Sequence, residues 1–348
     1  MLFNIEVDQG DVIEGYLIPD GYSDRPVVCV IGEEGELMRL ECLHARPAVL
    51  QSGRHETGVV GFRIDNSILP GVRNRKRLEI RDAKNGILIY RRPFMESPVQ
   101  MKVFRMEFQM LPMMKFDHYC SGRFQYALCG LERFGQETAL QAFHLNAIES
   151  IYLSGRLHLR NFEEFLDKGF TVIGYLPDPY YEMAARLTML KRLSQTNVAF
   201  LGERDRLSMG AAAAHFAEVV LDDERSLKKA LQTAGPKIRD PLISPATRQL
   251  VRTSPDQSVV RADVAPAIDL LSRFAVVGQD GMPFHFESAA AELMTLPLEN
   301  VPSISRHSAL EAIAQRLRRL AVAETLLEAD LILHHYVREA AGSHALSA

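Results

Sequence analysis

The pattern of hydrophobic and polar positions changes once along the chain, near residue 95. Before that point, short apolar runs alternate with turn sequences such as Pro19-Asp20-Gly21 and Asn85-Gly86. Asn-Gly between apolar runs is a strong hairpin signal, because both residues accept a positive φ. The runs predict strands at residues 3–7, 12–18, 26–31, 35–40, 59–64, 77–81 and 87–91. Short strands at this spacing predict an all-β sandwich over residues 1–95.

Beyond residue 100, helical periodicity dominates, and the clearest segment is a βα unit. Residues 170–176 form an apolar run, Pro177-Asp178-Pro179 interrupts it, and apolar positions then recur at helical spacing from Met183 to Leu193. In open α/β sheets, ligands bind beside the carboxyl ends of strands. The turn at Asp178 therefore predicts one edge of a ligand site.

The remaining apolar patterns predict an α/β domain over residues 100–342, with a parallel sheet and flanking helices. Further strands are predicted at residues 103–111, 198–201 and 274–277. Helices are predicted over residues 124–134, 138–148, 207–221, 225–233, 284–296, 309–320 and 324–340.

Composition and charge narrow the classes of protein. The net charge of -4 disfavours nucleic acid as the main partner. No apolar run reaches the roughly 20 residues of a membrane span, and the acidic N-terminus lacks the basic region of a secretory signal. The cysteines show no CxxC pairing, which is typical of reduced thiols. We therefore expect a cytoplasmic protein without a membrane span.

Several common catalytic motifs are missing from the sequence. HExxH, GxSxG, a Walker loop and GxGxxG do not occur, which disfavours zinc proteases, α/β-hydrolases, P-loop kinases and Rossmann dehydrogenases. His334 and His335 are adjacent on a predicted helix and face different directions. No metal site is predicted.

The strand, the turn Leu176-Pro177-Asp178-Pro179-Tyr180 and the following helix resemble the sulfotransferase family. Family members carry an Arg-Asp-Pro-Tyr type of turn and a later Ser, which hold the 3′-phosphate of the sulfate donor. The stretches 274–278, 286–296 and 327–336 are also similar. The resemblance implies a P-loop-type parallel sheet, and transfer of a sulfuryl group from the nucleotide 3′-phosphoadenylyl sulfate to a carbohydrate hydroxyl.

The donor-binding motifs of that family are degenerate in this chain. Pro177 stands where the family has Arg, Ala185 where it has Ser, and no Pro-Lys-Thr-Gly-Gly-Thr loop is present. The nearest candidate loop is Ser121-Gly122-Arg123, whose backbone N–H groups would bind an anion while Arg123 replaces the Lys. Whether the protein is an active enzyme stays open at this point.

The candidate site follows from this resemblance. We expect His118 as the general base and Arg123 as a catalytic cation. The donor would be held by Ser121, Gly122, Arg156, Asp178 and Arg186. Each residue has a plainer alternative: Asp178 as a helix cap, His118 as a structural side chain, and Arg186 as a paired surface residue.

The first 95 residues resemble N-terminal modules attached to bacterial enzymes of surface-polysaccharide synthesis. The supporting residues are Gly15-Tyr16, Pro19-Asp20-Gly21, Arg46-Pro47, Gly53-Arg54-His55 and Gly58 with Gly61-Phe62. This resemblance implies a role in cell-surface polysaccharide biosynthesis with a carbohydrate acceptor. The alternative is a catalytically inactive, sulfotransferase-like scaffold or glycan-binding protein, since the groups that catalysis most requires are replaced.

Overall fold

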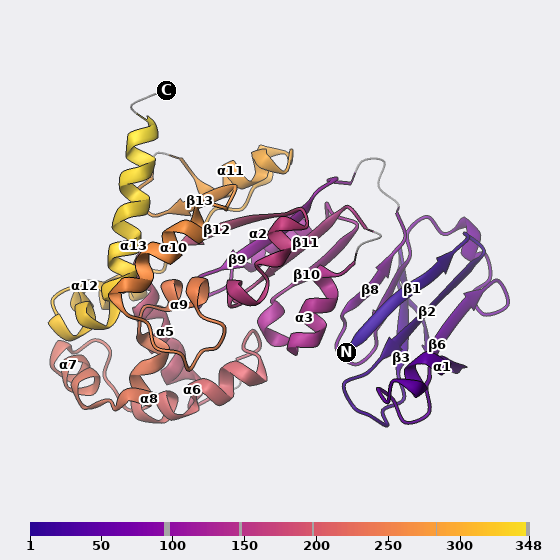
Figure 1. Cartoon of the computed structure of the whole chain (residues 1–348), viewed down its shortest axis with the longest axis horizontal. Coiled ribbons are helices and arrows are strands. Elements are labelled where there is room, and N and C mark those ends of the chain that lie inside the picture. The colour runs from indigo at the N-terminus through magenta and orange to yellow at the C-terminus, as the bar shows by residue number, and fades with distance from the viewer. Residues whose placement is uncertain (94–97, 146–147, 197, 283, 346–348) are drawn as a thin grey trace. The chain divides into compact units, whose positions relative to one another are not determined.

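The computed structural model describes residues 1–93, 98–145, 148–196, 198–282 and 284–345. The chain divides into two compact units. The first unit comprises Met1–Gln100, Ser121–Leu128 and Gly135–Tyr152. The second unit comprises Met101–Cys120, Cys129–Phe134 and Leu153–Ala348. Figure 1 shows the strands and helices of the chain.

Two antiparallel sheets form the N-terminal part of the first unit. One has the strand order β1-β2-β6-β5 and the other β4-β3-β7-β8. The elements are β1 (Leu2–Asp8), β2 (Val12–Ile18), β3 (Val27–Gly32), β4 (Gly35–Glu41), β5 (His44–Ala45), α1 (Pro47–Gln51), β6 (Val59–Asp65), η1 (Val72–Asn74), β7 (Glu79–Asp82) and β8 (Leu88–Arg91). Each strand predicted before residue 95 is confirmed, and only the two-residue β5 was missed.

A partly buried ion pair joins the ends of strands from these two sheets. Arg92, directly after β8, donates from Nε and Nη2 to the two carboxylate oxygens of Asp8 at the end of β1, at 3.0 Å each. The hydroxyl of Tyr90 donates to the same carboxylate at 2.7 Å. Although burial alone would raise it, the bonds from Arg92, Tyr90 and the Gly10 amide lower the pKa of Asp8. Bidentate pairing of this kind fixes both the distance between the two side chains and their relative orientation.

A five-stranded parallel sheet with the order β10-β11-β9-β12-β13 forms the centre of the α/β part. Its strands are β9 (Lys102–Glu107), β10 (Tyr126–Cys129), β11 (Ile151–Gly155), β12 (Phe170–Leu176) and β13 (Val276–Gln279). Its helices include α2 (Met114–Ser121), α3 (Gln136–Phe143), α4 (Glu164–Asp167), α5 (Pro179–Leu193), α6 (Glu203–Phe216), α7 (Glu224–Thr233), α8 (Pro236–Arg239), α9 (Pro245–Val251), α10 (Val264–Leu271), α11 (Phe286–Leu293), α12 (Ser308–Leu317) and α13 (Ala321–Ala345). Short 3₁₀ turns are η2 (Leu131–Arg133), η3 (Leu159–Asn161), η4 (Asp240–Leu242), η5 (Arg261–Asp263) and η6 (Leu298–Asn300). The mixed α/β fold class expected for this part of the chain is confirmed at this level.

The strand order reverses direction at β9. From β9 the chain builds β10 and β11 on one side, then crosses to β12 and β13 on the other side. β9 and its neighbour β11 are therefore followed by segments that leave in opposite directions, the first toward β10 and the second toward β12. A reversal of this kind opens a crevice at the carboxyl ends of the strands, where ligands of open α/β sheets bind.

Helix α5 anchors the helical layer of the second unit. It is buried on most of its surface and packs against α6, α12 and α13 (Figure 1). The apolar core around it includes Met183, Leu187 and Leu190, at the spacing that predicted the helix. Asp178 caps the helix, with its side chain accepting from the N–H groups of Tyr180 and Tyr181. The capping alternative for Asp178 is confirmed.

Two predicted elements are wrong, and several were missed, namely strand β11 and helices α2, α4, α8, α9 and α10. Residues 124–134, predicted as a helix, contain β10 and the turn η2, because Gly130 adopts a φ of 71° and ends the strand. Residues 198–201, predicted as a strand, form a turn before α6. Strand β11 was not predicted. Its apolar run Ile151-Tyr152-Leu153 is so short that periodicity could not identify it.

Gly278 on β13 provides a test of how closely the sheet and α11 pack. A Cβ added there would lie 2.4 Å from Cβ of Phe286. We therefore expect Gly278→Ala to lower the free energy of unfolding by about 1–3 kcal/mol, as overpacked cores do. Gly210 on the exposed side of α6 has nothing within 4 Å of such a Cβ, so Gly210→Ala should raise stability by up to about 1 kcal/mol. Urea denaturation of both variants measures this, and equal effects would contradict the packing described.

Candidate functional site

A cavity of about 420 Å³ lies in the second unit, beside the segments that follow the carboxyl ends of β9 and β11. Its wall is built from the segment after β9, the segment after β11, and helices α5, α6 and α9. The side chains that matter for its chemistry are Met110, Arg156, His158, Arg186, Arg248 and Gln249. The cavity thus occupies the crevice where the strand order reverses.

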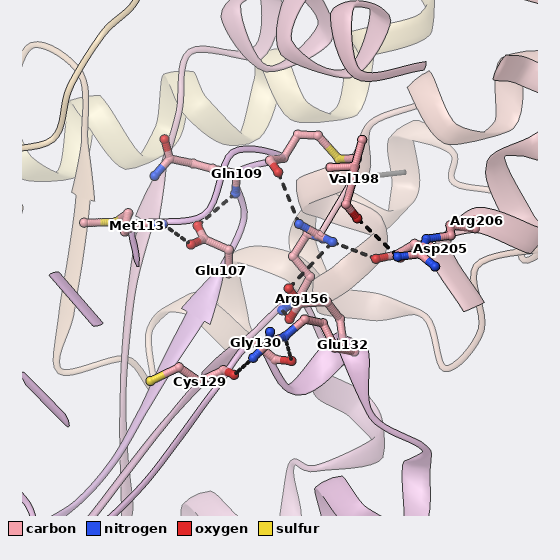
Figure 2. Close-up of polar contacts among 12 residues, drawn as sticks. Glu107, Gln109, Met113, Cys129, Gly130, Glu132, Arg156, Val198, Asp205 and Arg206 are labelled. Atoms are coloured by element: carbon pink, nitrogen blue, oxygen red, sulfur yellow. Dashed lines mark hydrogen bonds and ion pairs between the residues drawn. The ribbon is translucent and has the colours of Figure 1, made fainter. Parts of the chain in front are cut away.

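Arg156 is the first residue after β11 and is almost completely buried. Its Nη2 lies 2.7 Å from a carboxylate oxygen of Asp205 on α6 and 3.6 Å from one of Glu132 on η2. Its Nη1 donates to the carbonyl oxygen of Met110 at 3.2 Å. Figure 2 shows Arg156 between Glu132 and Asp205. Burial disfavours the charge, but these two carboxylates keep the pKa of Arg156 above its usual value.

Gly155 allows this arrangement. A Cβ at this position would lie 2.7 Å from the backbone nitrogen of Leu131 and 2.8 Å from Oε2 of Glu132. The same Oε2 accepts the backbone N–H of Arg156 at 2.9 Å. The close approach of η2 to the end of β11 therefore requires glycine.

Arg186 on α5 lines the cavity and forms a buried ion pair with Glu182. Its Nε donates to Oε1 of Glu182, one helical turn earlier, at 2.7 Å, and its Nη1 donates to the carbonyl oxygen of Pro241 at 3.2 Å. Oε2 of Glu182 accepts the backbone N–H of Met110 at 3.0 Å. Burial raises the pKa of Glu182 to about 7, against the opposing effect of Arg186.

Helix α9 contributes Arg248 and Gln249. Arg248 donates to the side chain and the carbonyl oxygen of Asp240 at 3.1 and 2.8 Å and to the carbonyl oxygen of Pro255 at 3.0 Å. Gln249 donates from Nε2 to the carbonyl oxygen of Glu107, at the end of β9, at 2.9 Å. The bond from Gln249 holds α9 against the central strand, and the bonds from Arg248 hold it against Asp240 and Pro255.

Asp330 on α13 caps helix α9 from outside that helix. It accepts the backbone N–H groups of Ala246 and Thr247 at 3.0 and 2.7 Å and the Thr247 hydroxyl at 2.7 Å. Ser244, the residue before α9, has a φ of 36° and donates from its backbone N–H to the carbonyl oxygen of Leu326, also on α13, at 3.0 Å. The wall that carries Arg248 therefore depends on α13 for its position.

His158 lines the same cavity two residues after Arg156. Its Nδ1 is buried, and among the described residues no hydrogen-bond partner is found for it. Burial, together with the positive charge of Arg204, lowers the pKa of His158. The imidazole is therefore neutral at pH 7 and can accept a proton.

The cavity lining carries more positive than negative charge. Arg156, Arg186, Lys237 and Arg248 face three carboxylates, Asp205, Asp240 and Asp256. Most of the guanidinium groups are already paired. Lys237 is exposed, and no ion pair or hydrogen bond of its side chain is found among the described residues. An anion entering the cavity would thus meet paired arginines and one unpaired ammonium group.

Of the site residues predicted from the sequence, Arg156 and Arg186 lie at this cavity. Asp178 lines a separate, shallow hollow, in which Arg318 pairs with Asp178 at 2.8 Å and Arg306 pairs with Asp280. His118 is exposed on α2. Ser121 ends α2 in the first unit, and Gly122 and Arg123 form the turn after it. The donor-binding role of this loop stays a prediction.

Sequence reasoning did not select several other residues that line the cavity, among them His158, Lys237, Arg248 and Gln249. Ser244-Pro245 is a helix-start signal that could have placed α9, because Ser precedes the first turn and Pro is favoured within it. His158 had no comparable signal, since β11 itself was not recognised.

Comparison of the chain with models of known protein families, with curated proteins and with solved structures finds no match.

Among the described residues, no group of three or more His, Cys, Asp or Glu side chains is placed to hold a metal ion. In the same part of the chain, no helix is both long and apolar enough to cross a membrane. The class defined by fold and site is a mixed α/β protein with a cation-lined cavity at the reversal of its strand order.

The capping role of Asp330 can be measured. Asp330→Asn should lower the free energy of unfolding by about 2 kcal/mol or more, because an NH2 group replaces one of the two carboxyl oxygens that accept from α9. Glu328→Gln is the matched control on the same helix. Glu328 is exposed, and its ion pair with Arg261 is long, at 3.9 Å. Its replacement should therefore cost less than about 0.5 kcal/mol. Similar urea denaturation midpoints for the two variants would show that the cap is unimportant.

Proposed function

We propose that the second unit binds a small molecule bearing a sulfate or phosphate group in the cavity beside the carboxyl ends of β9 and β11. The observation that carries this proposal is the convergence of arginines from three separate elements, Arg156 after β11, Arg186 on α5 and Arg248 on α9. Guanidinium groups are the usual partners of oxyanions in proteins.

The size and shape of the cavity agree with such a ligand. About 420 Å³ lies within the range of small-molecule sites, which are concave, partly apolar and lined by a few convergent polar groups. Leu157 and Met209 supply apolar wall, and Leu207 on α6 is 77% exposed beside it. A ligand with an anionic group and a less polar body would use both parts of the wall.

We further propose transfer of a sulfuryl group to a carbohydrate hydroxyl as the reaction to test, on the strength of the sequence resemblance. In that reaction the acceptor oxygen bonds to sulfur, the bond from sulfur to the bridging oxygen of 3′-phosphoadenylyl sulfate breaks, and a base takes the hydroxyl proton. Cations would stabilise the charge on the transferring oxygens. A neutral His158 in the cavity suits the base better than the exposed His118.

Binding of sulfate is the direct test of the site. We expect calorimetry to detect sulfate and the nucleotide bisphosphate at millimolar concentration or below. Lys237→Met should weaken sulfate binding by about threefold to tenfold, because it removes one nearby charge. The control is Lys229→Met, which removes the same charge from the exposed side of α7 and should leave the affinity unchanged. Neither substitution alters a buried group, so both variants should fold.

A turnover assay distinguishes the two functions that the sequence left open, an active transferase and an inactive binding protein. Incubation with 3′-phosphoadenylyl sulfate and a set of carbohydrate acceptors should release the bisphosphate if the protein is a transferase, and His158→Gln should reduce that rate by about 10²-fold or more. Binding of the nucleotide without turnover would favour the inactive, ligand-binding alternative. If neither sulfate nor the nucleotide binds, the proposed site is refuted.

A further inference from the structure

Glu182 is the buried carboxylate most directly connected to the cavity. It is 3% exposed and lies on α5, facing the segment after β9. One oxygen accepts from Nε of Arg186 and the other from the backbone N–H of Met110. Both partners of Glu182 line the cavity. Any charge that binds to Arg186 therefore acts on Glu182 through a single guanidinium group.

The other cations of the wall have carboxylate partners that are less able to release them. Arg156 is shared by Glu132 and Asp205, and Arg248 is held by Asp240 and by carbonyl oxygens. The arginines of the wall are already paired and Lys237 supplies one further positive charge, whereas a sulfate brings two negative charges. The balance is restored most simply if one carboxylate takes up a proton.

Two other buried carboxylates are poorer candidates for that proton. Glu107 accepts from Arg105 and from the backbone N–H groups of Gln109 and Met113. Asp330 accepts three bonds from Ala246 and Thr247. Burial raises the pKa of both carboxyls as it does that of Glu182, but each has three donors that oppose this effect, and neither is bonded to a cation of the cavity wall. Glu182 has two donors, and one of these is Arg186.

We propose that the cavity binds its oxyanion together with one proton, which Glu182 accepts as the anion takes over Arg186. The ligand is then the small sulfate or phosphate ester of the proposed function, on which this inference rests, and the site behaves as a proton-coupled anion site. Protonation of Glu182 leaves the positive charge of Arg186 for the ligand.

The surroundings of Glu182 are consistent with this role. Arg186 faces it from α5, Arg156 from the end of β11, and Asp330 and His334 from α13, where they share with it a small hollow of about 10 Å³. The pKa of Glu182, raised to about 7 by burial, means that it exchanges its proton near neutrality. Burial lowers the pKa of His334 and His158, so both are neutral there and do not supply the same charge change.

The test is calorimetry with sulfate, whose own charge does not change between pH 6 and 8. Titration at each pH in two buffers of different ionisation enthalpy gives the number of protons taken up. We expect about half a proton per sulfate at pH 7, less at pH 6 where Glu182 is already protonated, and more at pH 8. By linkage, sulfate affinity should fall as the pH rises through this range.

Glu182→Gln is the decisive variant, since glutamine keeps the shape and the acceptor for Met110 but takes up no proton. It should bind sulfate with an affinity independent of pH and with no proton uptake. His158→Gln should retain the uptake, and its loss in that variant instead would assign the proton to His158 and overturn the proposal. If Glu182→Gln does not fold, the pH series of the unaltered protein still decides. Sulfate binding without proton uptake would refute the coupling alone, whereas no sulfate binding would refute the proposed function.

Discussion

The structure of the cavity depends on the need to neutralise Arg156 where it is buried. An unpaired guanidinium at the end of β11 would cost several kcal/mol, and the chain supplies Glu132 from η2 and Asp205 from α6 on either side of it. These two ion pairs draw segments that are distant in the sequence to the end of one strand. Gly155 is required because the approach of η2 leaves no room for a Cβ. The crevice made by the reversal of strand order thereby becomes a defined site.

The same principle organises the rest of the wall. Arg186 is paired with Glu182 and Arg248 with Asp240, and the helix that carries Arg248 is capped by Asp330 from α13. Paired side chains of this kind are already held in place before a ligand arrives, which reduces the entropy lost on binding. Pairing also limits how much additional negative charge the wall accepts. In a cavity built from ion pairs, a ligand oxyanion can therefore take the place of a carboxylate beside an arginine.

The sequence predicted the class of fold better than the site. Regular alternation and the Asn85-Gly86 hairpin signal were sufficient for the antiparallel strands, and the apolar spacing from Met183 to Leu193 was sufficient for α5. Arg156 and Arg186 were selected as anion ligands, and both line the cavity. Their carboxylate partners could not be predicted, because Glu132 and Asp205 approach Arg156 only through tertiary packing. Strand β11 was missed for a different reason, because a run of five residues carries too little periodicity, and His158 was missed with it.

The central claim is that the crevice beside β9 holds an oxyanion. A crystal structure of the protein grown with selenate, a sulfate analogue with a strong anomalous signal, tests this most directly. The account predicts an anomalous peak inside the cavity, within hydrogen-bond distance of Arg186 or Lys237. A cavity without a peak at saturating selenate, with peaks only at exposed arginines elsewhere, would contradict it.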